Sequence, residues 1–509
     1  MGGGAAALLR EASPGSLLAG AAAVLLLWWA AAVLEWTWLG PRRMERALRA
    51  QGLRGTRYRF LWGDLKEERR LTAVALARPV PMDRPHDVLP RVSPLLHRAV
   101  EEHATRMIKL LIGGVAILDG EKWFKHRRIM NPAFHAEKLK GMLPAFSAAC
   151  TDLICRWENL LADSAGTIEL DVWSEFQNFS GDVISRAVFG VSYQEGRRIF
   201  LLEAEQLVRV TQAFRTSQIP GFSYCFNHKT PVLHNAHCFS PFSWLCKTVC
   251  SGIFHPKISP LPLSASLLPT ESNRRMKAIN RETKTILRGI IEKRHEAMKN
   301  GEPAKDDLFG MLMESNMNYS ESDGKSRRGI TVEEVIEECK LFYFAGTETT
   351  AVLLTYTMAV LSMHPEWLGR ARDVVLQVFG ENKPDFSGAS RLKVVTMVLY
   401  EVLRLYPPAL FVNRRTHKQT ELGGVMYPPD VTFVVPIMFI HRDPALWGHD
   451  AGEFNPGRFA EGVSKACSDP GAFIPFSWGP RICIGQNFAL LEAELAISMV
   501  LQRFEFELW

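Results

Sequence analysis

The sequence lacks the cysteine pattern of a disulfide-stabilised or zinc-binding protein. Its nine cysteines are an odd number in a chain of 509 residues, and they follow no regular spacing. Four of them lie between residues 222 and 269 with four histidines, but no C-x-x-C or H-x-x-x-H pair occurs there. These absences argue against a disulfide framework and a zinc site, and they favour a reducing compartment for the globular part.

Basic charge is scarce outside one short segment. The net charge of the chain is +6, and residues 41–60, with seven arginines and one glutamate, account for +6 on their own. Residues 1–40 carry −1, which leaves +1 for the rest of the chain. Nucleic-acid-binding proteins usually spread basic charge over the folded body, so no nucleic-acid partner is expected.

Long uncharged runs are also rare, and the most prominent lies near the N-terminus. No charged residue occurs from Leu17 to Leu34, a length just sufficient for one membrane span. Two tryptophans and the arginine-rich segment follow, as expected at a membrane surface that faces the cytosol. We therefore expect residues 1–40 to form a single transmembrane anchor and residues 41–60 a basic linker. A cleaved secretory signal ending near Ala30–Ala32 is the alternative.

Hydrophobic spacing predicts a mainly α chain with minor β structure. The longest helical pattern, residues 331–363, opens with a capping box of Thr331 and Glu334 and becomes apolar on nearly all sides, which indicates a buried helix. Alternating residues predict short strands over 422–440, and residues 222–269 are interpreted as an unstructured insertion. The other predicted helices span residues 61–77, 92–112, 137–161, 173–190, 194–216, 271–298, 366–379, 391–405 and 486–503.

One loop near the C-terminus has the residues that a thiolate ligand requires. Residues 476–485 read FSWGPRICIG, and Cys483 comes directly before the predicted helix 486–503. Backbone N–H groups and the helix N-terminus stabilise a thiolate, and glycines allow a close backbone approach to a flat cofactor. Taken alone, Cys483 also fits a buried structural cysteine in a glycine-rich turn.

The same loop resembles the haem-binding loop of cytochromes P450, F-x-x-G-x-R-x-C-x-G, at every fixed position. The resemblance implies that Cys483 is the axial ligand of a haem b iron and that Arg481 pairs with a haem propionate. Phe476, Gly479 and Gly485 are the other fixed residues and are expected to bind the cofactor.

A polar segment interrupts the predicted buried helix. Residues 345–350 read AGTETT and resemble the A-G-x-[DE]-T-[TS] motif of the same family. By that resemblance Thr349 delivers protons to the oxygen being reduced, with Glu348 behind it in the relay, and Gly346 opens space for O2. Alone, the pattern also fits a helix kink or a satisfied core threonine.

Glu401 and Arg404 form an i, i+3 pair that resembles the E-x-x-R helix of the family. In the family this pair meets an arginine of a later segment, which is Arg458 here. The resemblance gives the three residues a structural role in supporting the haem loop, and none is expected to be catalytic.

Two further positions are expected to hold the haem. Trp123 and Arg127 lie four residues apart, on one helix face, and resemble the W-x-x-x-R helix that binds a propionate. Arg414 follows Arg404 by ten residues and is a further propionate candidate, for which Arg415 competes.

Finer features narrow the resemblance to the plant clan that contains cytochrome P450 family 72. They are YRFLWGD at 58–64, DGEKW at 119–123 and RIMNPAFH at 128–135. The resemblance implies a monooxygenase of the endoplasmic reticulum membrane that oxidises a hydrophobic small molecule, such as a plant terpenoid or hormone. Electrons would come from NADPH through a flavin enzyme, NADPH-cytochrome P450 reductase. Residues 61–509 are then one catalytic domain with its body in the cytosol.

Three departures from the family pattern bear on activity. Residues 90–113 are shorter than the family's substrate-contacting region, residues 225–267 have no family counterpart, and the expected C-terminal strands do not follow Trp509. They fit a faulty gene model, or a catalytically impaired or non-catalytic paralogue. A haem enzyme that rearranges its substrate without O2 is a further alternative, against which Thr349 argues.

Overall fold

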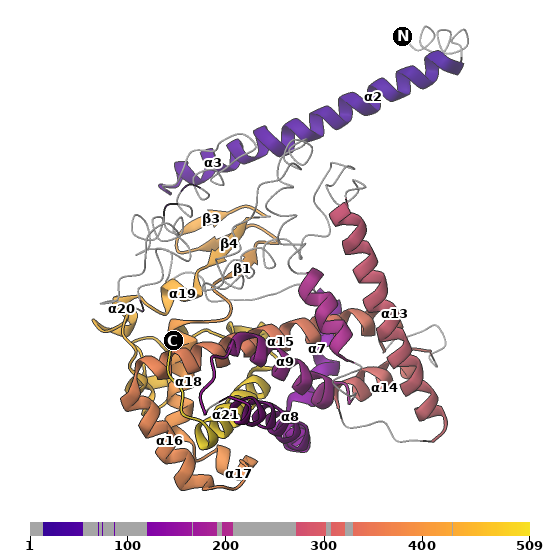
Figure 1. The fold of residues 1–509 in the computed structure, drawn as a ribbon. Coiled ribbons are helices and arrows are strands. Elements are labelled where there is room, and N and C mark those ends of the chain that lie inside the picture. The colour runs from indigo at the N-terminus through magenta and orange to yellow at the C-terminus, as the bar shows by residue number, and fades with distance from the viewer. Residues whose placement is uncertain are drawn as a thin grey trace.

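The structure, a computed structural model, is mainly helical with two small sheets (Figure 1). It describes residues 14–53, 70, 74, 86, 120–164, 166–190, 196–206, 271–301, 307–320, 329–429 and 431–508. The fold class predicted from the sequence is therefore confirmed as mainly α with minor β. The predicted helix 92–112 and the predicted insertion 222–269 lie outside the described residues, as does 61–77 apart from Arg70 and Val74.

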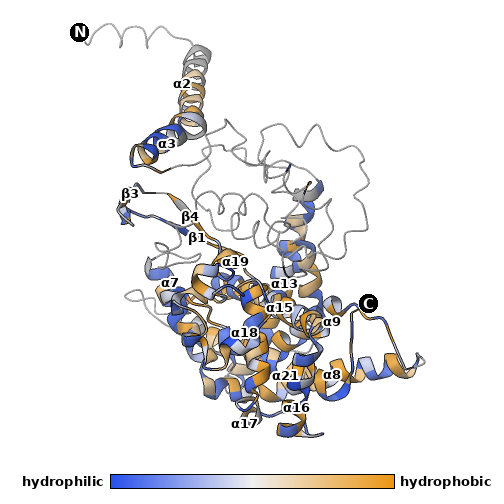
Figure 2. Ribbon diagram, turned by 90° about the vertical axis from the view of Figure 1, so that its left-hand side faces the viewer, coloured by the Kyte–Doolittle hydropathy of each residue, from blue (hydrophilic) through white to orange (hydrophobic). Residues whose placement is uncertain are grey.

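The described N-terminal part is a helical arm. It consists of α2 (Pro14–Leu34), the π-helical turn η1 (Glu35–Leu39) and the arginine-rich α3 (Gly40–Ala50). Figure 1 shows α2 extending away from the helical body, and Figure 2 shows the change from an apolar α2 to a polar α3. Among the described helices, none combines the length and the apolar character needed to cross a membrane. The predicted transmembrane anchor is not confirmed.

The longest helix lies at the centre of the body. α15 runs from Val332 to Met363, and its N-terminus has the predicted capping box. The Thr331 Oγ1 accepts from the Glu334 N–H at 3.2 Å, and the Glu334 Oε2 accepts from the Thr331 N–H at 2.9 Å. The helix ends at His364, because Pro365 opens the next one.

α9 (Val172–Val183) and α21 (Gln486–Arg503) pack directly on α15, and α8 (Ala136–Ala162) packs on both of them to complete the main core. Aromatic rings fill the space between them. Phe146 meets Phe488 edge to face with centroids 4.9 Å apart, and Trp157 contacts Phe504 at 5.5 Å. Burying such a ring is worth about 1.5–3 kcal/mol, so this core fixes the helices that carry the candidate site.

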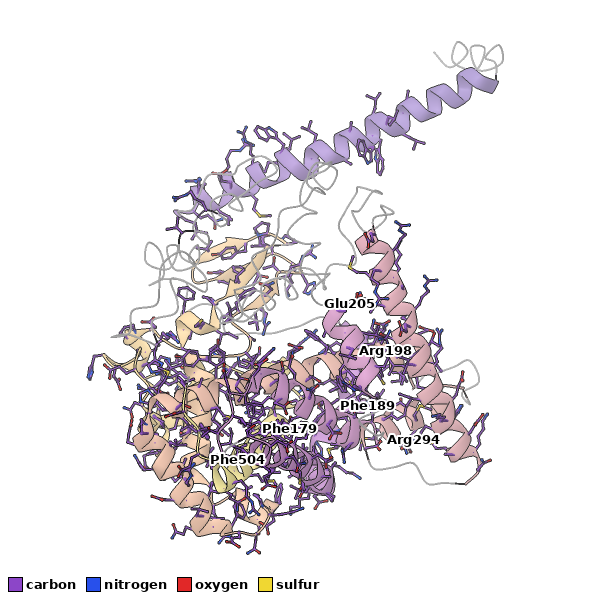
Figure 3. All side chains as sticks on the ribbon, viewed as in Figure 1. Phe179, Phe189, Arg198, Glu205, Arg294 and Phe504 are labelled. Carbon is purple, nitrogen blue, oxygen red and sulfur yellow. The ribbon has the colours of Figure 1, made fainter. Side chains whose placement is uncertain are left out.

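A peripheral layer packs on the body through buried apolar residues, among them Ile199, Leu287 and Ile291, and ion pairs link its two helices to each other. A helix at 196–206 lies beside α13 (Glu271–Lys299), and Figure 3 shows Arg198 and Glu205 between the two. Arg198 pairs with Glu282 at 2.5 Å, and Glu205 with Arg275 at 2.5 Å. Exposed pairs of this kind contribute about 0–1 kcal/mol each, so the buried apolar residues hold this layer more than the ion pairs do.

The strands lie beneath the N-terminal arm in Figure 1. β1 (Val412–Arg415) pairs antiparallel with β4 (Thr432–Val435), and β2 (Thr420–Leu422) with β3 (Val425–Tyr427). The end of α3 meets this region, since the Gln51 amide bonds both the N–H and the C=O of Met426, at 2.9 and 3.0 Å. The prediction of strands over 422–440 is partly wrong: pairing begins earlier, and the apolar residues Ile437–Ile440 are all buried as the helical turn α19.

The remaining predicted helices agree closely with the structure. Predicted residues 173–190 correspond to α9 continued by η4 (Ile184–Val188), and 194–216 is helical as far as it is described, to residue 206. α14 was not predicted. The bounds of the other elements are α7 Gly120–Met130, η3 Asn131–Phe134, α14 Leu308–Ser320, α16 Pro365–Phe379, α17 Phe386–Ala389, α18 Lys393–Leu405, α20 Pro444–Trp447, η6 Pro456–Phe459, η7 Val463–Lys465, η8 Pro470–Ala472 and η9 Gly479–Arg481.

Candidate active site

The loop that carries Cys483 is a tightly bonded turn between η8 and α21. The Cys483 N–H donates to the Phe476 carbonyl at 2.9 Å, and the Ile482 N–H donates to the Gly479 carbonyl at 3.0 Å. Gly479 has a φ of 80°, which explains a glycine there, and Ser477 has a φ of 67°, a conformation that costs a non-glycine residue about 1–2 kcal/mol. The loop is thus held in one shape, at some strain.

Cys483 is exposed, and its neighbours shift the pKa of its thiol in both directions. Despite this exposure, the surrounding protein atoms are close enough that burial raises the pKa of the thiol. Two groups act in the opposite direction and favour the thiolate: the Gly485 N–H, which donates to the sulfur, and the positive charge of Arg127. The arrangement suits a soft metal ligand that is open toward one partner.

Two arginines from distant elements bind the same loop. Arg127, from α7, donates from Nη1 to the Ile482 carbonyl at 2.8 Å and from Nε to the Asn131 Oδ1 at 2.6 Å. Arg414, from β1, donates from Nη2 to the Ser477 Oγ at 2.8 Å. Burial lowers the pKa of both guanidinium groups. These bonds all go to uncharged oxygens. Both cations are therefore partly removed from water without a carboxylate partner in these contacts, and an anion bound beside them would offset that cost.

Trp123 and Arg481 complete the ring of predicted cofactor-binding residues. The Arg481 guanidinium lies over the Trp123 ring, 4.2 Å from its centroid, and the Arg481 side chain is buried. Residues of α7 and of the loop line an open pocket of about 470 Å³, among them Trp123, Phe124 and Pro480. The structure therefore brings Trp123, Arg127, Arg414 and Arg481 together around the Cys483 loop.

The polar segment of α15 contains a buried carboxyl group. Glu348 is 8% exposed, and burial raises its pKa to about 7, although the Gln177 Nε2, which donates to its Oε1 at 3.0 Å, favours the ionised form. The neighbouring Thr349 donates its hydroxyl to the Ala345 carbonyl at 2.7 Å, the local i−4 bond that polar residues make inside helices. Glu348 can therefore gain or lose a proton near neutral pH.

Gly346 has a packing reason that the sequence did not reveal. A Cβ at this position would lie 2.3 Å from the Cδ1 of Ile184, so the side chain of Ile184 lies directly against the glycine. The space that the missing side chain leaves is taken by Ile184 in this structure. Whether Gly346 also makes room for O2 stays a prediction.

A closed charge cluster joins α18 to the segment at 441–458. Glu401 and Arg404 form a bidentate pair at 2.7 Å with no exposed surface, and Arg458 bonds the same carboxylate at 3.1 Å. Arg404 also donates to the carbonyls of His441 and Ala451 at 2.7 and 2.6 Å. The structure thus brings the three predicted residues together, and their contacts are structural.

Three contributors to the site were missed by the sequence analysis. Gln177 bonds Glu348 from α9, Ser477 accepts from Arg414, and Asn131 accepts from Arg127. Asn131 could have been found, because it follows Arg127 by four residues on one helix face. Gln177 and Ser477 carry no comparable local pattern.

Known proteins resemble this chain over almost its whole length. The family model described as Cytochrome P450 matches residues 97–509. Cytochrome P450 CYP72A616 from Paris polyphylla is 49% identical, with 94% of this chain and 90% of that protein covered. Cytochrome P450 72A15 from Arabidopsis thaliana is 42% identical, with 93% and 90% covered. Secologanin synthase 2 from Catharanthus roseus is 41% identical, with 93% and 89% covered.

Proposed function

The chain belongs to the cytochrome P450 family and is a monooxygenase of the plant CYP72 type. On this basis we propose that Cys483 ligates the haem iron and that the enzyme oxidises a hydrophobic small molecule. The observation that carries this proposal is the Cys483 loop: an exposed cysteine, a backbone donor to its sulfur and partly buried arginines around it.

The residues fit a haem by their donor set. Cys483 is the proposed soft ligand, and Arg127, Arg414 and Arg481 are the proposed partners of the propionates; the Trp123 ring lies beside Arg481. Arg127 and Arg414 bond only uncharged oxygens in the contacts described above, so a bound carboxylate would offset their desolvation. When bound, the haem supplies the centre at which O2 is activated for insertion of one oxygen atom into a C–H bond.

Glu348 and Thr349 are proposed to handle protons. The Glu348 carboxyl, with a pKa of about 7, is about half protonated at neutral pH and can both take up and release a proton, and Gln177 donates to it. The Thr349 hydroxyl keeps lone pairs free to accept a hydrogen bond while it donates to the Ala345 carbonyl. Thr349→Ala is expected to uncouple NADPH consumption from product formation, and unchanged coupling would remove Thr349 from the relay.

The substrate and the electron donor are proposed at a coarser level. The resemblance to the family 72 clan supports a plant terpenoid or hormone as substrate, and the relatives named secologanin synthase support a small organic molecule. An NADPH-dependent reductase is the proposed electron source. Membrane attachment through residues 1–40, at the endoplasmic reticulum, stays a prediction. It is supported by the exposed apolar side chains Val24–Trp28 and is tested by carbonate extraction of membranes.

A catalytically impaired paralogue, or a faulty gene model, remains the second candidate. It is favoured by the short region at 90–113 and the insertion at 225–267, which lie outside the described residues. The test is the carbon monoxide difference spectrum of the reduced chain, with a Cys483→Ser variant and a variant without 225–267. We expect a thiolate-type Soret shift that Cys483→Ser abolishes. A shift seen only after the deletion would favour a faulty gene model, and a shift in Cys483→Ser would refute the ligand assignment.

A further inference from the structure

A buried histidine connects the two halves of the candidate site. His126, on α7, is 4% exposed, and its Nδ1 lies 2.6 Å from the Oε1 of Glu338, on α15. The Glu338 side chain is also buried, at 9% exposure. A bond of this length between a ring nitrogen and a carboxylate is charge-assisted and among the stronger side-chain bonds. It joins residues 212 positions apart in the chain.

A second contact supports the first. Lys122, one turn before His126 on the same helix, pairs with the Oε1 of Glu334 at 2.9 Å, and the His126 Nε2 lies 3.8 Å from the same oxygen. Although burial alone would raise the pKa of Glu334, the Thr331 N–H and the Lys122 ammonium lower it to about 2, so this carboxylate is ionised. One face of α7 is therefore bonded to two successive turns of α15.

These bonds matter because α7 has few other connections to α15. α7 packs chiefly against α14 and η3. It carries Trp123 and Arg127, which meet the Cys483 loop, whereas α15 carries Glu348 about 15 Å further along its axis from Glu338. The histidine bond is thus a direct link between the helix that contacts the loop and the helix that carries the proton-handling segment.

We propose that His126 is a positioning residue: its bond to Glu338 fixes α7, and with it Trp123 and Arg127, relative to α15, so that the cofactor is held at one distance from Glu348 and Thr349. The inference rests on the proposed function for its meaning at the haem. A core histidine that only pairs with Glu338 and has no effect on the site is the plain alternative; its Nε2 is buried without a hydrogen-bond partner among the described residues.

The test compares variants of the full-length protein. His126→Phe keeps the size of the ring but leaves the buried Glu338 without its donor, whereas His126→Gln retains a donor and Glu338→Gln an acceptor. Controls are His135→Phe, an exposed histidine, and Glu333→Gln, an exposed carboxylate on α15 that bonds Arg288 and Lys284 of α13. The readouts are haem release to an acceptor protein, the thiolate-type fraction of the carbon monoxide spectrum, and amide hydrogen exchange of residues 120–130.

For His126→Phe we expect haem release and α7 amide exchange to accelerate by roughly tenfold, with a lower thiolate-type fraction. His126→Gln and Glu338→Gln, which keep a hydrogen bond at this position, should show haem release and α7 exchange close to those of the parent. Both controls should match the parent. A lower unfolding midpoint with unchanged haem release from the folded protein would overturn the proposal, as would unchanged α7 exchange. If the parent itself gave no thiolate-type spectrum, the proposed function would fail. The exchange comparison needs no haem and would still decide whether the bond fixes α7.

Discussion

Two groups of charged residues in this protein, one fully buried and one partly buried, differ in what they bond. In the cluster of Glu401, Arg404 and Arg458, each cation meets a carboxylate and the carboxylate also accepts from a backbone N–H. Around the Cys483 loop, Arg127 and Arg414 bond carbonyl, amide and hydroxyl oxygens. The cations of the first group are paired with carboxylates of the chain, whereas the two arginines of the second bond only uncharged oxygens, as expected if they pair with haem propionates.

The same contrast extends to the carboxyl group on α15. Glu348 bonds the neutral Gln177, and burial raises its pKa to about 7, while burial lowers the pKa of Arg127 and Arg414. Burial thus disfavours the charged form of each of these groups, although both arginines stay charged at physiological pH. We propose that this difference separates charges that stabilise the fold from charges that take part in cofactor binding and proton transfer.

The largest expected effect comes from opening the closed cluster. Arg404→Leu leaves Glu401 with part of its partners and frees the carbonyls of His441 and Ala451, so we expect the free energy of unfolding to fall by about 3–5 kcal/mol. Urea unfolding measures this, with the exposed Glu505→Gln as a control. A loss below about 1 kcal/mol would mean that the cluster is not the structural element its bonding indicates.

Glu348→Gln should stabilise the protein at alkaline pH. The folded-state pKa of about 7 lies above the ordinary value of 4.5, so folding favours the protonated form and stability falls as pH rises from 4.5 through 7. Above pH 7 the cost is about 3 kcal/mol, and the uncharged glutamine avoids it. We expect the variant to exceed the parent at pH 8 and to match it near pH 4.5, with Glu333→Gln showing no such gain. Equal stability at pH 8 would place the folded-state pKa near its ordinary value.

Arg414→Leu should separate haem binding from stability. The variant loses a cation beside the loop, so haem affinity is expected to fall about tenfold, but it also loses a desolvated guanidinium, so the haem-free chain should be no less stable. Haem titration and the unfolding midpoint of the haem-free chain measure the two effects. Lys418→Leu, an exposed residue of the same region, is the control. A large loss of stability of the haem-free chain without a change in haem affinity would mean that Arg414, like Arg404, has a structural role.

How far the sequence predicted these groups depends on the distance between partners. The Cys483 loop is one contiguous segment, and its pattern identified every fixed residue, as did the E-x-x-R pattern for Glu401 and Arg404. The helix 331–363 was predicted almost to the residue because its capping box and its terminating proline are local. Local spacing was sufficient wherever the interacting residues share one turn or one helix.

Partners from distant elements could not be found in this way. Gln177 reaches Glu348 across 171 residues, and only the packing of α9 on α15 brings them together. The choice between Arg414 and Arg415 depended on strand register, because a shift of one residue exchanges the two faces of a strand. The predicted strands began too late, so the sequence offered no register, whereas the structure gives the Ser477 contact to Arg414.

The smallest expected effect lies at Ser477, where strain and bonding can be separated. Ser477→Gly removes the cost of the left-handed conformation but gives the unfolded chain more freedom, so the stability of the haem-free chain should change by less than about 1 kcal/mol. Ser477→Ala keeps the strain and removes the Oγ, so a loss of about 0.5–1.5 kcal/mol is expected. Both variants remove the hydrogen bond between Ser477 and Arg414. Because the cation is still present, haem affinity should fall by only about two- to threefold, less than for Arg414→Leu. An affinity loss as large as that of Arg414→Leu would show that the orientation of the guanidinium, and not its charge alone, distinguishes the open group from the closed one.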